Sequence, residues 1–201
     1  MSEVGHLETR RLEALSNTVF GVAMTLLAYQ APREKFTGAD PQWREIWHIY
    51  GAYISTLLLS FIVAGMFWYS HQRRLAYASH GNRSEVVLNL FFLLSIILLP
   101  VTCGLYGNNY DSPNVTVLYG ANLAMIGTLN AVLWAIPIAR KKDWITLTTP
   151  VFSAGLLVAA SVASLVDPHA PKYIWPLAFL SPVVSAYAER LSQRKPNSGR
   201  A

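Results

Sequence analysis

The sequence predicts an all-α membrane protein with six transmembrane helices. Six stretches of the chain are apolar and close to the length of about 20 residues, within a range of roughly 17–25, that a helix needs to cross a bilayer. Charged residues make up only 13% of the chain, against roughly 25% in a typical soluble domain. The chain also contains six Trp and ten Tyr, which concentrate at membrane–water interfaces.

The first predicted helix covers residues 12–29. It opens with the adjacent polar residues Ser16 and Asn17 and continues as an apolar run. Because an α-helix has about 3.6 residues per turn, side chains three and four positions apart share a face. One face of this helix carries Thr18, Val22, Thr25, Leu26 and Tyr29.

The next three predicted helices cover residues 46–70, 86–106 and 115–138. Each is a long apolar run. Segments that contain Gly, Pro, Asn or Asp, the residue types that favour turns, connect the first helix to the second, the third to the fourth and the fifth to the sixth. The connection between the third and fourth helices, with the sequence GNNYDSPN, has this composition throughout.

The last two predicted helices cover residues 144–166 and 173–191. Pro176 and Pro182 interrupt the sixth apolar run, but proline is tolerated in a membrane helix when neighbouring groups bond the freed carbonyl. We therefore expect one six-helix transmembrane domain over residues 1–191. The polar segment 192–201 is expected to be a disordered tail.

The basic residues predict how the helices are oriented. With the N-terminus in the cytoplasm, 12 of the 16 Lys and Arg residues fall on cytoplasmic segments and 4 on external ones. Short cytoplasmic loops carry such an excess of Lys and Arg, so both termini are expected in the cytoplasm. The same bias accounts for the net charge of +5 without a nucleic-acid partner, and membrane lipid is the expected surrounding.

The predicted helices lack the residues that enzymes and proton-coupled transporters use. No Asp, Glu, Lys or Arg lies near the middle of a predicted span, and the five His residues lie at span ends or in loops. The motifs HExxH and GxSxG do not occur in the sequence. The single Cys103 excludes an intramolecular disulfide and a Cys-based metal site. We expect no enzymatic activity and no cofactor.

The polar face of the first helix has two interpretations. Ser, Thr and Asn side chains commonly hydrogen-bond between membrane helices, and in this interpretation the face only packs. Alternatively, apolar and hydroxyl side chains alternate along an ion pathway, where apolar rings gate by dewetting. One helix cannot surround a pathway, so this second interpretation requires an oligomer. The pattern alone leaves both open.

Several segments resemble one known family. The stretch RLEALSNTVFGVAMTLL, from Arg11 to Leu27, is similar to the first-helix signature of the transmembrane-protein-175 family of potassium channels. The stretch YISTLLLSFIVAGMFWYSHQRRL resembles the family's second helix, with Trp68 and His71 in the expected order. The stretches LNLFFLLSIILLP, which contains Asn89, and LYGANLAMIG resemble the third and fourth helices.

The resemblance implies a homotetramer in which the first helix of each six-helix subunit lines a central pore. It places the narrowest point at Val22, further apolar lining at Leu26 and Tyr29, and the pore threonine at Thr25. The implied function is a potassium-permeable cation channel with weak to moderate selectivity for K⁺ over Na⁺, and potassium ions pass near Val22 and Thr25. A one-repeat chain implies a prokaryotic plasma membrane.

The resemblance also implies a hydrogen-bond hub that braces the first helix. Its members are expected to be Arg11, Ser16, Asn17, Trp68, His71 and Asn89. The sequence departs from the family signature at Leu15, where the family has Phe, and at Asn17, where it has Asp. Because a neutral amide bonds more weakly than a carboxylate, the hub should be weaker here. A small-solute or proton transporter and a non-conducting scaffold are the alternatives.

Overall fold

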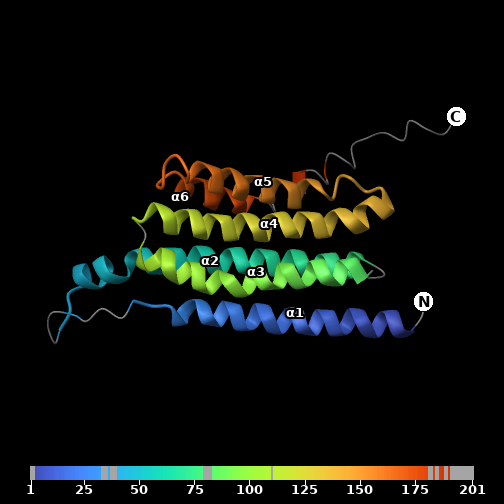
Figure 1. Ribbon diagram of the computed structural model, residues 1–201, viewed down its shortest axis with the longest axis horizontal. Coiled ribbons are helices and arrows are strands. Elements are labelled where there is room, and N and C mark those ends of the chain that lie inside the picture. Colours follow the sequence, from blue (N-terminus) through green and yellow to red (C-terminus); the bar gives the residue numbers. More distant parts are fainter. Residues whose placement is uncertain are drawn as a thin grey trace.

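The computed structural model describes residues 3–32, 36, 40–78, 83–109, 111–180, 183, 186, 187 and 190. Long helices run side by side along the long axis of the molecule (Figure 1). They are α1 (Glu3–Tyr29), α2 (Trp43–Tyr77), α3 (Arg83–Asn108), α4 (Pro113–Lys141) and α5 (Thr148–Ala163). A single α-helical turn, α6 (Pro171–Ile174), and a 3₁₀ helix (Trp175–Leu180) follow.

Four helices are long and apolar enough to cross a membrane, judged over the part of the chain that the structure describes. They are the segment Arg10–Tyr29 of α1 and the whole of α2, α3 and α4. This confirms an all-helical membrane protein and the predicted positions of its first four helices. Helix α5 has 16 residues, or about 24 Å at 1.5 Å per residue, which is shorter than a hydrocarbon core of roughly 30 Å.

The predicted sixth helix differs in its described part. Pro171 begins the single turn α6, and the chain then tightens into the 3₁₀ helix that contains Pro176. Proline at the first turn suits a helix start, whereas Pro176 cannot donate the backbone bond of a continuing α-helix. Much of the predicted range 173–191, and the predicted tail 192–201, lie outside the described residues. Six spans per subunit remain a prediction.

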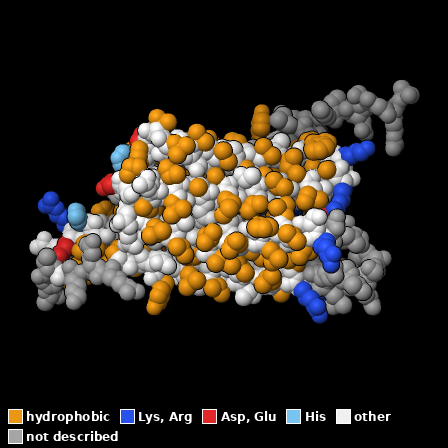
Figure 2. All heavy atoms as spheres, viewed as in Figure 1, with side chains coloured by type: hydrophobic (Ala, Val, Ile, Leu, Met, Phe, Trp, Pro, Cys, Tyr) orange, Lys and Arg blue, Asp and Glu red, His pale blue; other side chains and the backbone are white. Residues whose placement is uncertain are grey.

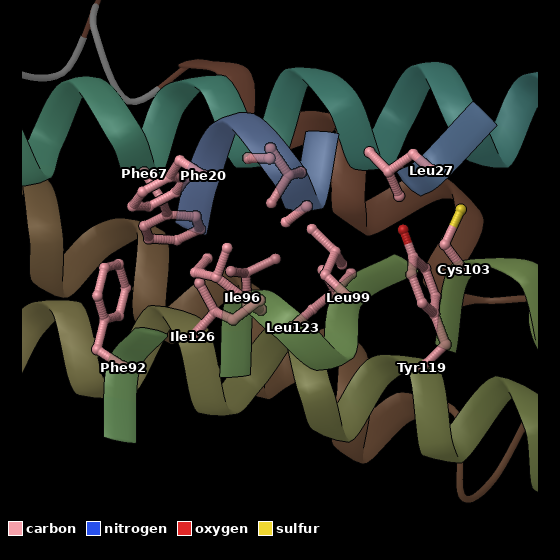
Figure 3. Packing of buried hydrophobic residues seen from close by; sticks show 14 of the residues in the cluster. Phe20, Leu27, Phe67, Phe92, Ile96, Leu99, Cys103, Tyr119, Leu123 and Ile126 are labelled. Atoms are coloured by element: carbon pink, nitrogen blue, oxygen red, sulfur yellow. The ribbon is translucent and has the colours of Figure 1, made fainter. Parts of the chain in front are cut away.

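Helix α1 lies at one edge of the bundle. It packs against α2 and α3, which pack against α4, and α5 packs against α4 at the opposite edge (Figure 1). A buried cluster joins these helices, and Figure 3 shows Phe20 and Leu27 of α1 directed toward Phe92, Ile96 and Leu99 of α3. Helix α1 therefore has one packed face and one face that no other helix covers among the described residues.

Close contact between α2 and α3 depends on a glycine. A Cβ atom at Gly107 of α3 would lie 2.9 Å from Tyr53 Cδ2 and 3.1 Å from Tyr53 Cα. Small residues allow membrane helices to approach one another in this way. The close approach also lets the Tyr53 hydroxyl donate a hydrogen bond to the Leu27 carbonyl of α1, at 2.5 Å.

The surface matches a membrane environment. Hydrophobic side chains cover the middle of the visible face, and Lys and Arg side chains gather at the end of the bundle where α1 begins (Figure 2). Since α4 ends at that same end (Figure 1), its last residues Arg140 and Lys141 belong to this basic group. The apolar middle and polar ends are the distribution that a bilayer requires.

Candidate functional site

The two faces of α1 differ sharply in burial. Ser16 and Phe20 are at most 1% exposed, and Ala23 and Leu27 are at most 3% exposed. On the other side, Val22 is 51% exposed, Leu26 44% and Tyr29 79%. Membrane helices bury one face by packing, so the free face is the part of α1 that is available to a second chain, to lipid or to water.

The two threonines on the free face direct their hydroxyl protons inward. Thr18 Oγ1 donates to the Ala14 carbonyl oxygen at 2.9 Å, and Thr25 Oγ1 donates to the Val22 carbonyl oxygen at 2.8 Å. A hydroxyl has one proton and two lone pairs. Once the proton is bonded within the helix, the exposed oxygen acts as an acceptor. Thr18 and Thr25 are both exposed, so each offers an oxygen of the kind that binds a cation.

A buried hydrogen-bond network lies on the packed face. Ser16 Oγ lies 3.4 Å from His71 Nε2, and the same nitrogen lies 2.8 Å from Asn89 Oδ1. Ser16, His71 and Asn89 are each fully buried. Phe20 and Phe92 enclose the imidazole, with ring centroids 6.1 and 5.7 Å from that of His71. This network joins α1 to α2 and α3.

A second, exposed contact lies one residue further along α1. Asn17 Oδ1 accepts hydrogen bonds from Trp68 Nε1, at 2.9 Å, and from Gln72 Nε2. Both donors are on α2 and are four residues apart, which places them on one side of that helix. Asn17 therefore does here what a carboxylate would do, because it presents one oxygen to two N–H donors.

Arg11 lies apart from this hub. It is exposed, and no hydrogen bond joins it to the other five predicted members. The structure brings together Ser16, Asn17, Trp68, His71 and Asn89, and adds Arg74 and Gln72 of α2. Arg74 is 2% exposed, and its Nη2 donates to Asn89 Oδ1 at 2.8 Å. The available sequence signal was spacing, since Arg74 follows His71 by three residues and Gln72 follows Trp68 by four.

Comparison with known proteins identifies part of the chain. Residues 11–100 match the family described as the endosomal/lysosomal potassium channel TMEM175. This segment, which is under half of the chain, is similar to the TMEM175 family. The segment contains the free face of α1 and every member of the hub. The match confirms the resemblance that the sequences of the first three helices show.

Two relatives of the TMEM175-type segment are informative. A potassium channel of Streptomyces collinus is 32% identical over 96 residues, which are 46% of this chain and 45% of the relative. The match therefore spans under half of that relative's length. The crystal structure of a lysosomal potassium-selective channel TMEM175 homologue from Chamaesiphon minutus superimposes with a TM-score of 0.72, over 90% of this chain and 98% of that chain. At 18% sequence identity, that likeness shows the fold alone.

No metal-binding cluster accompanies the TMEM175-type site in the described ranges. They contain no group of three or more His, Cys, Asp or Glu side chains arranged to hold a metal ion. On the free face of α1, the exposed side-chain oxygens include the hydroxyls of Thr18 and Thr25. These are weak, uncharged acceptors, which suit brief contact with a cation better than tight binding.

Proposed function

We propose that this chain is the subunit of a potassium-permeable cation channel, with α1 lining the pore. The observation that carries the proposal is the free face of α1. It alternates the apolar Val22 and Leu26 with the hydroxyl oxygens of Thr18 and Thr25, and it lies within the segment that matches the TMEM175 family.

In this proposal the side chains of α1 act in rings. Val22 and Leu26 form apolar constrictions, which exclude ions by dewetting when they are narrow. Thr25 lies less than one turn from Val22, and its exposed lone pairs replace part of the hydration shell of a passing K⁺ ion. Because these oxygens are neutral and few, we expect weak to moderate preference for K⁺ over Na⁺. Tyr29, 79% exposed, lies at the mouth of the pore.

The pathway requires several copies of the chain. One helix cannot enclose an ion, and closed cyclic symmetry is the usual way in which identical chains assemble. We infer a homotetramer, which is what the family resemblance implies for a one-repeat chain, with lipid around its outer surface. We propose that the basic end of the bundle lies on the cytoplasmic side of a prokaryotic plasma membrane, and the excess of Lys and Arg at that end supports this orientation.

The test is to reconstitute the purified protein into vesicles with a K⁺ gradient and to count its subunits by native mass spectrometry. Channel-rate K⁺ flux from a four-chain particle is the expected result. Slow, saturable uptake coupled to a second solute would instead indicate a transporter. No flux from a correctly folded protein, or a particle with one chain, would overturn the proposal. Empty vesicles prepared in the same detergent are the control.

A further inference from the structure

The hub contains one side chain that the proposed pore does not use, the guanidinium of Arg74. It is 2% exposed, and its Nη2 lies 2.8 Å from Asn89 Oδ1. Its Nε has no partner among the described residues. A buried charge within a membrane protein is costly and points to a function. The nearby buried Glu85 bonds Arg140 of α4, at 2.5 Å, and attracts Arg74 through its charge. The hydrogen bond that holds Arg74 in the hub is the one to the neutral Asn89 amide.

Arg74 determines the orientation of the Asn89 amide. The oxygen and nitrogen of an asparagine side chain have nearly the same shape, and their assignment depends on the hydrogen bonds around them. A guanidinium has five N–H donors and no acceptor. The Asn89 atom that lies 2.8 Å from Arg74 Nη2 must therefore be the oxygen.

The same oxygen then determines the tautomer of His71. His71 Nε2 lies 2.8 Å from Asn89 Oδ1, and an amide oxygen can only accept. Nε2 therefore carries the proton. The other ring nitrogen, Nδ1, is buried without a hydrogen-bond partner among the described residues. A proton there would have no acceptor and would add a second positive charge beside Arg74, which is unfavourable. His71 is thus neutral, with Nδ1 unprotonated.

The direction of the bonds continues to α1. Ser16 Oγ donates its proton to the Leu12 carbonyl oxygen at 2.7 Å, so toward His71 it can only accept. The one proton on His71 Nε2, which bonds Asn89 Oδ1 at 2.8 Å, is shared with Ser16 Oγ at the longer distance of 3.4 Å. From Arg74 Nη2 through Asn89 Oδ1 and His71 Nε2 to Ser16 Oγ, each contact pairs a donor with an acceptor, and one donor-only side chain fixes the order. Arg74 Nε and Asn89 Nδ2 have no partner among the described residues.

We propose that Arg74 is a positioning residue that sets the direction of the hydrogen bonds holding α1. Without its donor, the Asn89 amide is free to turn over. The amide nitrogen, which has no partner in the present orientation, then donates to His71 Nε2, and the imidazole proton moves to Nδ1. The turned amide thus exchanges an unpartnered Asn89 N–H for an unpartnered His71 Nδ1–H, and Ser16 loses its donor. Helix α1 is then held less firmly at the start of its free face. The consequence for ion flux rests on the proposed function, whereas the tautomer of His71 does not.

The experiment reads the tautomer directly, by solid-state NMR of the full-length protein with ¹⁵N-labelled histidine in lipid bilayers. The His71→Gln variant identifies the His71 signals among the five histidines. Arg74→Leu removes the donor, Arg74→Gln replaces it with a group that both donates and accepts, and Arg74→Lys keeps a donor-only cation. The matched control is Arg73→Leu, because Arg73 is adjacent but exposed and lies over the Tyr69 ring, 6.0 Å from its centroid.

We expect the Nε2–H tautomer alone in the unaltered protein, in Arg74→Lys and in Arg73→Leu. In Arg74→Leu and Arg74→Gln the Nδ1–H tautomer should appear. An unaltered protein with its proton on Nδ1, or with both nitrogens protonated, would overturn the proposal even if no variant folds. Retention of pure Nε2–H in both the Leu and Gln variants would overturn it as well.

K⁺ flux into vesicles gives the second measurement. Flux through Arg74→Leu should fall severalfold, with Arg74→Lys and Arg73→Leu close to the unaltered protein. A changed tautomer with unchanged flux would overturn the positioning role. If the unaltered protein passes no ions, the proposed function fails, and the NMR result still decides whether Arg74 sets the His71 tautomer.

Discussion

Replacement of Asn17 tests whether the exposed contact between α1 and α2 stabilises the subunit. Asn17→Ala removes the acceptor of two N–H donors, Trp68 Nε1 and Gln72 Nε2. A hydrogen bond contributes about 0.5–1.5 kcal/mol net. Because Trp68 is 41% exposed, its freed donor reaches water or lipid headgroups, and we expect a total loss near the lower limit, about 1 kcal/mol for the pair.

Asn17→Asp should have the opposite effect. A carboxylate oxygen accepts the same two donors, and charge-assisted hydrogen bonds are roughly twice as strong as neutral ones. We therefore expect a gain of about 1 kcal/mol. In a chain of this size about 1 kcal/mol shifts Tm by roughly 2–4 °C, so the Ala and Asp variants should differ by roughly 4–8 °C and lie on opposite sides of the unaltered protein.

The assay is thermal unfolding in detergent at neutral pH, followed by circular dichroism. Thr18→Ala is the matched control, because the Thr18 hydroxyl bonds only the Ala14 carbonyl of its own helix and its loss should change stability by no more than about 0.5 kcal/mol. Equal Tm values for Asn17→Ala and Asn17→Asp, or a lower Tm for Asp than for Asn, would refute this account of the contact.

Three further predictions concern the pore and the packing. Val22→Ala should raise K⁺ flux into vesicles by about tenfold if it lowers the barrier to ion passage by about 1.4 kcal/mol. The control is Val132→Ala, the same change at a residue of α4 that is 44% exposed. Equal flux through the two variants would exclude Val22 as the constriction. Thr25→Val should change the K⁺/Na⁺ permeability ratio measured from reversal potentials, and an unchanged ratio would count against a selectivity role. Gly107→Ala should lower the free energy of unfolding, measured by denaturant titration, by about 1–3 kcal/mol through overpacking against the α2 backbone. The control Gly155→Ala, whose Cβ would meet nothing within 4 Å, should leave it unchanged. An unchanged free energy of unfolding for Gly107→Ala would show that the helices separate without cost.

Hydropathy predicted the cores of the first four helices but not their ends. Helix α1 begins at Glu3 rather than at residue 12, and α2 continues to Tyr77 rather than to residue 70. The apolar run marks only the part of a helix that lies in lipid. Beyond it, residues with high helix propensity such as Glu, Leu, Arg and Ala continue the same helix into water, and no change in hydropathy marks where it stops.

The site was predictable to the extent that it depends on one helix. Fixed helical geometry placed Val22, Leu26 and Tyr29 on one face of α1, where they are exposed. The choice between Arg11 and Arg74 for the hub depends instead on how α2 packs against α3. Both arginines lie near span ends with similar surroundings in the sequence. Only the tertiary structure shows that Arg74 is buried beside Asn89.

The hub and the free face of α1 are related by helix geometry. Ser16 and Asn17 are adjacent, about 100° apart around the helix axis, and each contacts α2 through a different side chain, His71 or Trp68. Two contacts at different angles fix the rotation of α1, which one contact would not. At about 100° per residue, Val22 points roughly 190° from the direction midway between Ser16 and Asn17, almost directly away from the hub. A rotation of α1 about its axis by one residue would turn Val22 away from this outward direction. The hydrogen bonds of Ser16 and Asn17 to α2 therefore determine which side chain of α1 points outward on its free face.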